Sequence, residues 1–173
     1  IYNQPVTLAP TTVASPNAAY QRMANFWGLV EDLREGTYKI RSEHRKYLNQ
    51  EPRETDDAYD TRLARSTVVP YLQRIEKMLS GMLVRKPVRL DDVSDLVREQ
   101  LFDVDLEGND LNVWLYNTAR LAISFGHVGV LVDAPKEGDK TRPYWVTYTP
   151  KDILGFRSEI VDGARQLTQL RLL

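Results

Sequence analysis

"LNVWLYNTARLAISFGHVGVLVD", Leu111–Asp133, changes its hydrophobic period part-way along the stretch. In its first half, apolar residues recur every three or four positions, the spacing of a helix, and Asn109 or Asp110 precedes them as a capping residue. Gly126 then offers the left-handed conformation that ends many helices. The apolar run after it has the composition of a strand. The stretch therefore predicts a helix that leads directly into a β unit.

Three further strand candidates follow the first one, VGVLVD (128–133). They are PYWVTYT (143–149), ILGFRSEI (153–160) and ARQLTQLRLL (164–173), joined by turn-forming segments rich in Gly, Pro, Asp and Lys. The first strand is almost entirely apolar, which predicts a central position, whereas the later ones alternate and should each have a solvated face. We therefore expect a mainly antiparallel β unit from about residue 127.

Amphipathic helices are expected before the β unit. Residues 1–16 are rich in Pro, Thr and Ala and predict an extended N-terminal arm. A first helix should start at Ser15-Pro16 or Asn17 and stop at Gly36, and residues 38–40 read as a short strand.

A second helix is expected behind the cap Thr55. Pro70 lies within this helical pattern and should kink it or divide it into two helices in tandem, because proline removes a backbone hydrogen bond. The residues predicted to face inward are Tyr59, Leu63, Val68, Tyr71, Leu72, Ile75, Met78, Leu79 and Met82. Together the elements predict one α+β domain over residues 17–173.

Composition narrows the function classes. The chain contains no cysteine, which excludes disulfides and thiolate chemistry, and no apolar run approaches the ~20 residues of a membrane span. A net charge of −1 argues against a segment that coats nucleic acid. Because the chain begins at Ile1 and ends in a strand-like run, we expect it to be a piece of a longer protein.

Candidate reactive residues do not form a convincing set. His127 and Asp133 suggest a base and its orienting acid, but on one extended strand they lie roughly 20 Å apart. Two histidines cannot make a three-histidine metal site, and the acidic loop at 103–107 lacks the spacing of a calcium loop. No segment of the sequence matches the glycine-rich motifs that bind phosphates or dinucleotides. We expect no catalytic residue, metal or cofactor.

Two groups of segments resemble the N-terminal part of tailed-bacteriophage portal proteins. The first is YDTRLARS (59–66) with LSGMLVRKP (79–87), and the second is FGHVGVLVDAP (125–135) with RPYWVTYTPKDILGFR (142–157). The likeness runs from about Phe26 to the end of the chain. It implies the wing domain of a portal, at the outer rim of a ring.

The resemblance also implies a function. Portal proteins form a ring, usually of twelve subunits, at one capsid vertex, and double-stranded DNA is packaged and ejected through it. The partners would be the major capsid protein, the terminase and head–tail adaptor proteins, and the location would be the virion, without membrane contact. ATP hydrolysis belongs to the terminase, so the chain would not be an enzyme. The parts that meet DNA would lie beyond residue 173.

Charge is distributed unevenly along the chain, which suggests a subunit interface. Residues 39–89 carry twelve Lys or Arg against seven acids, whereas residues 91–110 carry eight acids and one Arg. In a ring, one subunit's basic flank would meet its neighbour's acidic flank. The predicted interface residues are Arg62, Arg65, Arg74, Lys77, Arg85, Lys86, Asp91, Asp92, Asp95, Asp103 and Asp105.

Two alternatives of other classes stay open at this point. One is a metal-independent hydrolase or nuclease that uses His127 and Asp133. The other is a monomeric DNA-binding adaptor that uses the basic second helix, whose affinity for DNA would fall steeply with salt.

Overall fold

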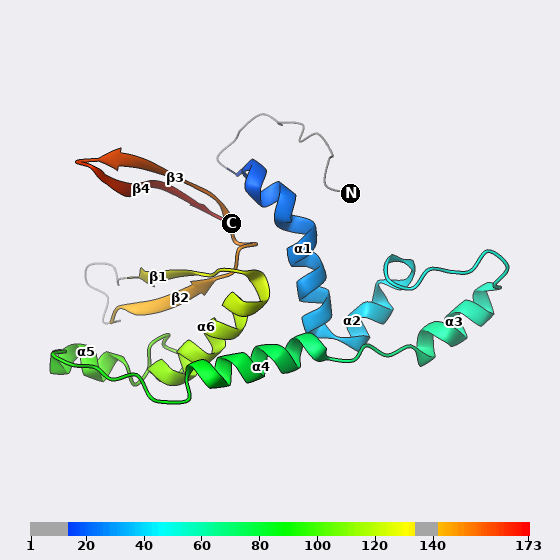
Figure 1. The fold of residues 1–173 in the computed structure, drawn as a ribbon, viewed down its shortest axis with the longest axis horizontal. Helices are drawn as coiled ribbons and strands as arrows, with labels where there is room; N and C mark the ends of the chain where they lie inside the picture. Colours follow the sequence, from blue (N-terminus) through cyan, green and yellow to red (C-terminus); the bar gives the residue numbers. More distant parts are fainter. Residues whose placement is uncertain (1–13, 134–141) are drawn as a thin grey trace.

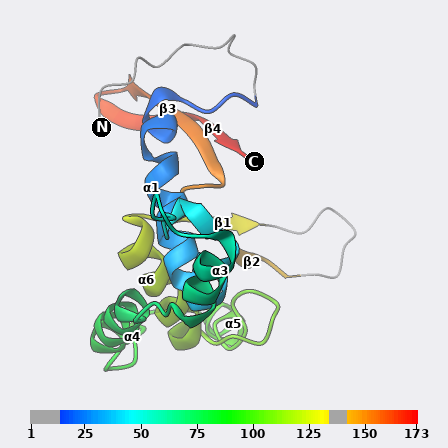
Figure 2. The same cartoon turned by 90° about the vertical axis from the view of Figure 1, so that its right-hand side faces the viewer.

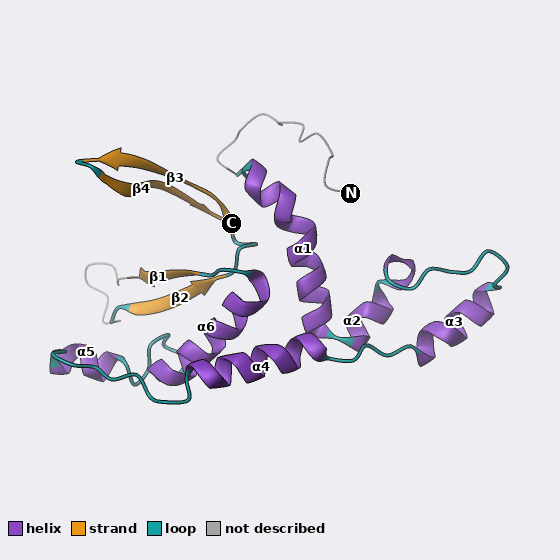
Figure 3. Cartoon of the chain, viewed as in Figure 1, coloured by secondary structure: helices purple, strands orange, loops and turns teal. Residues whose placement is uncertain are grey.

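A computed structural model describes residues 14–133 and 142–173 (Figure 1). Helices come first and strands second along the chain, so the predicted α+β class is confirmed (Figure 3). The predicted arm lies almost entirely outside the described residues. The elements are α1 Ala18–Glu35, α2 Thr37–Ser42, the 3-10 helix η1 His44–Lys46, α3 Asp56–Arg65, α4 Tyr71–Leu83, α5 Asp95–Gln100, α6 Leu111–Phe125, β1 Gly129–Asp133, β2 Tyr144–Tyr148, β3 Ile153–Val161 and β4 Ala164–Leu172.

The molecule is elongated, with α1 standing over α4 and α6 (Figure 1). The segment with α3 projects at one end of the long axis, and α5 lies at the other end. Figure 2 shows the β3–β4 hairpin at the top of α1, far from α4 and α5. No helix within the described ranges has the length and apolar character needed to cross a membrane.

Local capping sets the helix starts as the sequence predicts. The side chains of Asn17, Thr55 and Asp110 each accept a hydrogen bond from the backbone N–H three residues ahead, at the starts of α1, α3 and α6. Gly126 ends α6 with φ of 88°, the left-handed region that favours glycine.

The expected kink at Pro70 is wrong, and the alternative of two tandem helices is confirmed. The chain leaves α3 in extended conformation at Ser66 and re-enters a helix only at Tyr71. Proline disfavours helical backbone in the residue before it, so the break falls ahead of Pro70. The Pro70 carbonyl accepts the first hydrogen bond of α4, from the Arg74 N–H.

The short strand expected at residues 38–40 is also wrong, because these residues lie in α2. Two side chains of α2 fasten it to the extended link between α3 and α4. The Thr37 hydroxyl accepts from the Val68 N–H at 3.1 Å, and Arg41 donates to the Ser66 carbonyl at 2.8 and 2.6 Å. These contacts involve residues at least 25 positions away in the sequence, so the local sequence does not reveal them.

The four strands form two separate antiparallel hairpins. β1 pairs with β2, with Leu131 opposite Val146, and β3 pairs with β4. The predicted central position of β1 is wrong, because β2 is its only partner among the described residues and Val132 is exposed. An apolar run shows that side chains can be buried, but it does not fix how many strands pair beside it.

The β1–β2 hairpin packs against α6 through tryptophans. The Trp114 and Trp145 rings meet edge to face with centroids 5.0 Å apart, and the two hydroxyls of Thr118 and Thr147 lie 3.3 Å apart. The Trp145 ring thus covers Trp114, the largest side chain of α6. Near the other end of α6, the Trp27 indole N–H donates to the Phe125 carbonyl at 3.3 Å.

A buried carboxylate joins the three central helices. Glu76 of α4 is 0% exposed. Its Oε1 accepts from Nε of Arg34 in α1 at 2.9 Å, and its Oε2 lies 3.5 Å from a guanidinium nitrogen of Arg120 in α6. Gln73, one turn before Glu76, donates to the Arg34 carbonyl. We call Arg34, Glu76 and Arg120 the Glu76 clamp.

Removing the clamp charge should destabilise the fold. In Glu76→Gln, two guanidinium groups lose their counter-charge while the cavity keeps its shape, so we expect a loss of about 3 kcal/mol in the free energy of unfolding. Urea unfolding followed by far-UV circular dichroism measures this loss. The matched control is Glu35→Gln at the exposed end of α1, where a change within about 0.5 kcal/mol is expected. Equal stability of the two variants would contradict the role of the clamp.

The start of α1 is fixed to β3 and β4. The Asn17 N–H donates to the Leu154 carbonyl at 2.8 Å, and Arg171 donates to the Ser15 carbonyl at 2.8 Å. Gly155 lies directly beneath this contact. A Cβ atom at Gly155 would lie 2.9 Å from the Asn17 side-chain nitrogen and 2.8 Å from the Arg171 guanidinium.

Gly155→Ala should therefore loosen the junction between α1 and the β3–β4 hairpin. Asn17 cannot move without losing its cap on α1, so we expect a destabilisation of about 1–3 kcal/mol in urea unfolding. Gly28→Ala is the control, because nothing lies within 4 Å of a Cβ there and alanine favours the helix. If Gly155→Ala is as stable as the wild type, the closeness of Asn17 and Arg171 to Gly155 does not restrict the side chain at this position.

Candidate subunit interface

The outer face of α4 carries a row of exposed apolar side chains. Tyr71, Ile75, Met78, Leu79 and Met82 recur at helical spacing and are 38–66% exposed. We call these five residues the α4 stripe. Taking about 200 Å² for a large side chain in full exposure, the stripe offers about 550 Å². A typical monomer's largest apolar patch measures about 300–600 Å² and often has a function.

The stripe corrects the prediction that these residues face inward. Of the nine residues predicted to be internal, Tyr59 and Leu63 are buried, Val68 and Leu72 are half-buried, and the five of the stripe are exposed. α4 instead turns Glu76 and Ser80 toward α1 and α6. These two polar residues lie one turn apart on the same face, and their spacing is the signal in the sequence that could have revealed the orientation.

Basic side chains border the stripe. Arg74 and Lys77 are exposed on α4, on the flank away from the clamp, and Arg85 and Lys86 follow the end of the helix. All four belong to the predicted interface set. The only acid in α4 is Glu76, which is already engaged inside the molecule. The outer face of α4 is therefore apolar with a positive margin.

A second exposed surface combines apolar and acidic groups. It is carried by α5 and the residues beside it, with Leu96 69% and Phe102 73% exposed. Asp91, Asp92 and Asp95, all predicted interface residues, lie on the same segment and are also exposed. We call these five residues the α5 surface. Figures 1 and 2 both place α5 apart from α4, so the two surfaces do not cover each other within one chain.

Three predicted interface residues already have partners inside the chain. Arg62 donates to both oxygens of Glu54 at 2.7 Å. Asp103 pairs with Arg142 at 2.8 Å. Asp105 accepts from the Asn109 amide nitrogen at 2.7 Å. The other predicted interface residues are exposed: Arg65, Arg74, Lys77, Arg85, Lys86, Asp91, Asp92 and Asp95.

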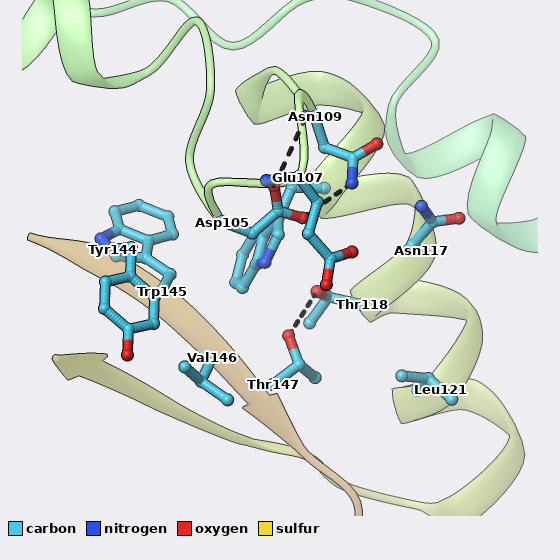
Figure 4. Close-up of a pocket in the computed structure, with 11 residues that line it drawn as sticks. Asp105, Glu107, Asn109, Asn117, Thr118, Leu121, Tyr144, Trp145, Val146 and Thr147 are labelled. Carbon is cyan, nitrogen blue, oxygen red and sulfur yellow. Dashed lines mark hydrogen bonds between the residues drawn. The ribbon is translucent and has the colours of Figure 1, made fainter. Parts of the chain in front are cut away.

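The acidic loop before α6 is closed by its own hydrogen bonds (Figure 4). Asp105 accepts from the Glu107 N–H at 3.0 Å as well as from Asn109. Burial raises the pKa of the Asp105 carboxyl, but these hydrogen bonds outweigh it and hold the pKa below its ordinary value. The loop, α6 and β2 line a shallow pocket at Trp114 and Trp145. In the part of the chain that the structure describes, no three metal-ligating side chains come together.

His127 and Asp133 lie at opposite ends of the first strand. His127 precedes β1 and places its ring edge to face with Trp27, at a centroid distance of 6.0 Å. Asp133 ends β1 and accepts a hydrogen bond from the Tyr144 hydroxyl at 3.0 Å. The predicted separation of the two side chains is confirmed. The structure does not bring them together as a base and its orienting acid.

The segment around α3 is held together mainly by polar contacts. Tyr59 is buried, with the guanidinium groups of Arg45 and Arg62 5.1 and 5.5 Å from its ring centroid. Its hydroxyl donates to the Leu48 carbonyl at 3.0 Å. The hydrogen bonds from Arg62 lower the pKa of Glu54 to about 2. We call residues 44–66 the α3 arm.

No protein-family model matches the chain. No curated protein matches it either.

The stability of the α3 arm should depend on pH. The ordinary pKa of Glu54 is 4.5 and its pKa in the fold is about 2. The Glu54–Arg62 contribution is thus fully present above pH 4.5 and is lost as the pH falls toward 2. Carboxyl carbon NMR should show Glu54 titrating near pH 2, and Arg62→Gln should return its pKa toward 4.5. Titration of the wild-type Glu54 near pH 4.5 would contradict the pairing.

Proposed function

We propose that the chain is a structural subunit of a bacteriophage portal ring at the capsid vertex, the conduit for packaging and ejecting double-stranded DNA. The observation that carries the proposal is the α4 stripe, a large apolar surface that the subunit does not bury itself. Ring subunits need such surfaces because each must bind two neighbours. The resemblance of residues 59–87 and 125–157 to portal proteins supplies the identity of the ring.

The exposed area of the chain supports an assembled state. The chain exposes 13164 Å², whereas a compact monomer of 19.9 kDa exposes about 8,700 Å². If the 21 residues outside the described ranges exposed as much as an unfolded chain, about 3,500 Å², about 9,700 Å² would remain for the other 152 residues. A compact monomer of that size exposes about 7,900 Å², so an excess of about 1,800 Å² would still be left. Two standard interfaces remove about 1,600 Å² from one subunit.

The role is structural, with partners set by the ring. In this proposal the assembled portal contacts the major capsid protein, the terminase and head–tail adaptor proteins, and its place is the virion. Hydrolysis of ATP belongs to the terminase. The positions of His127 and Asp133 at opposite ends of β1 favour this reading over a hydrolase that uses both.

The full-length protein should assemble into a closed ring. Native mass spectrometry over a range of salt concentrations should give one dominant oligomer of about twelve subunits, and negative-stain imaging should show a ring with a central channel. A strictly monomeric protein at every salt and protein concentration would overturn the proposal. A monomer whose DNA affinity falls steeply with salt would favour the DNA-binding adaptor instead.

A further inference from the structure

The α4 stripe needs an occupant of matching chemistry. A covering surface must offer apolar side chains for Tyr71, Ile75 and Met78, and acids for the Arg74 and Lys77 margin. With the stems of the two basic residues, the stripe approaches the ~800 Å² that one partner buries in a stable interface.

We propose that the α4 stripe of one subunit receives the α5 surface of the next. The proposal rests on the ring function above and names the contact that builds the ring. The α5 surface has both components that the stripe requires: Leu96 and Phe102 are exposed apolar groups, and Asp91, Asp92 and Asp95 are exposed acids on the same segment. The charges of the two surfaces are opposite in sign, so they attract each other and fix the register.

A contact between two α4 helices fits less well. Such a contact would place apolar residues together but would give Arg74 and Lys77 no acid, since the one acid of α4 is held in the Glu76 clamp. Nucleic acid is also a poor occupant, because a phosphate backbone covers charge and leaves the apolar stripe in water. The α5 surface of a second copy matches both parts of the stripe.

This pairing joins two different surfaces and is therefore head-to-tail. A head-to-tail contact gives a ring if its rotation closes and a filament if it does not, whereas one surface that pairs with itself stops at a dimer. α4 and α5 lie apart in the subunit, so one subunit can hold a neighbour at each surface (Figures 1 and 2).

Two complementary variants of the full-length protein test the pairing. The stripe-blocked variant, Met78→Asp with Met82→Asp, removes the α4 stripe and keeps the α5 surface. The α5-blocked variant, Leu96→Lys with Phe102→Lys, removes the α5 surface and keeps the α4 stripe. All four positions are exposed, so the far-UV circular dichroism of each variant should equal that of the wild type. Arg22→Asp, on exposed α1 surface away from both sites, is a charge-reversing control that should assemble normally.

Each variant alone should lose assembly and run as a monomer in native mass spectrometry. An equimolar mixture restores one intact contact per pair, so it should give a heterodimer and nothing larger. If either variant alone assembled into rings of the wild-type size, the pairing would be overturned and the ring function would still stand. A mixture that stays monomeric would also overturn it, and a stripe that pairs with itself would instead give a homodimer of the variant whose stripe is intact. A wild-type protein that never assembles would remove the ring function and the pairing together.

Discussion

The buried carboxylate of Glu76 is the constraint on which the arrangement of the helices depends. A charge without solvent must be paired, and the two guanidinium groups that pair it come from α1 and α6. This requirement fixes how α4 rotates about its own axis. Once Glu76 faces Arg34 and Arg120, helical geometry sends Ile75, Met78 and Met82 to the outside. The exposed stripe is thus a direct consequence of the clamp.

Sequence reasoning succeeded where structure is local and failed where it is tertiary. The caps Asn17, Thr55 and Asp110 bond to backbone within three residues, so their effect can be seen in the sequence. The orientation of α4 could not be predicted from its apolar period, because that rule assumes that a helix buries its apolar face in its own chain. In the candidate interface, the exposed acids and bases were predictable from composition, whereas the pairing of Arg62 with Glu54 required the fold.

Polar tethers replace a large core in the elongated parts of the molecule. Asp32, near the end of α1, accepts from Lys46 and from the Tyr47 hydroxyl, each at 2.6 Å. Burial raises the pKa of the Asp32 carboxyl, but these hydrogen bonds outweigh it and keep the pKa below its ordinary value. The base of the α3 arm is thereby fixed to α1 by directional contacts. Directional contacts hold an angle between elements with little buried apolar area.

The angle between the α4 stripe and the α5 surface would decide whether head-to-tail contacts close into a ring. Contacts within the fold hold both α4 and the segment after α5 in place. The clamp holds α4 on α6. On the other side, the Leu111 N–H donates to the Leu101 carbonyl at 3.0 Å, and the Trp145 N–H donates to Val104 at 2.9 Å, so the segment after α5 is bound to α6 and β2. A change of a few degrees per subunit, repeated around a ring, would alter the number of subunits that closes it. In the proposed ring, the polar contacts at these two junctions would therefore set the geometry of assembly in addition to stabilising the single chain.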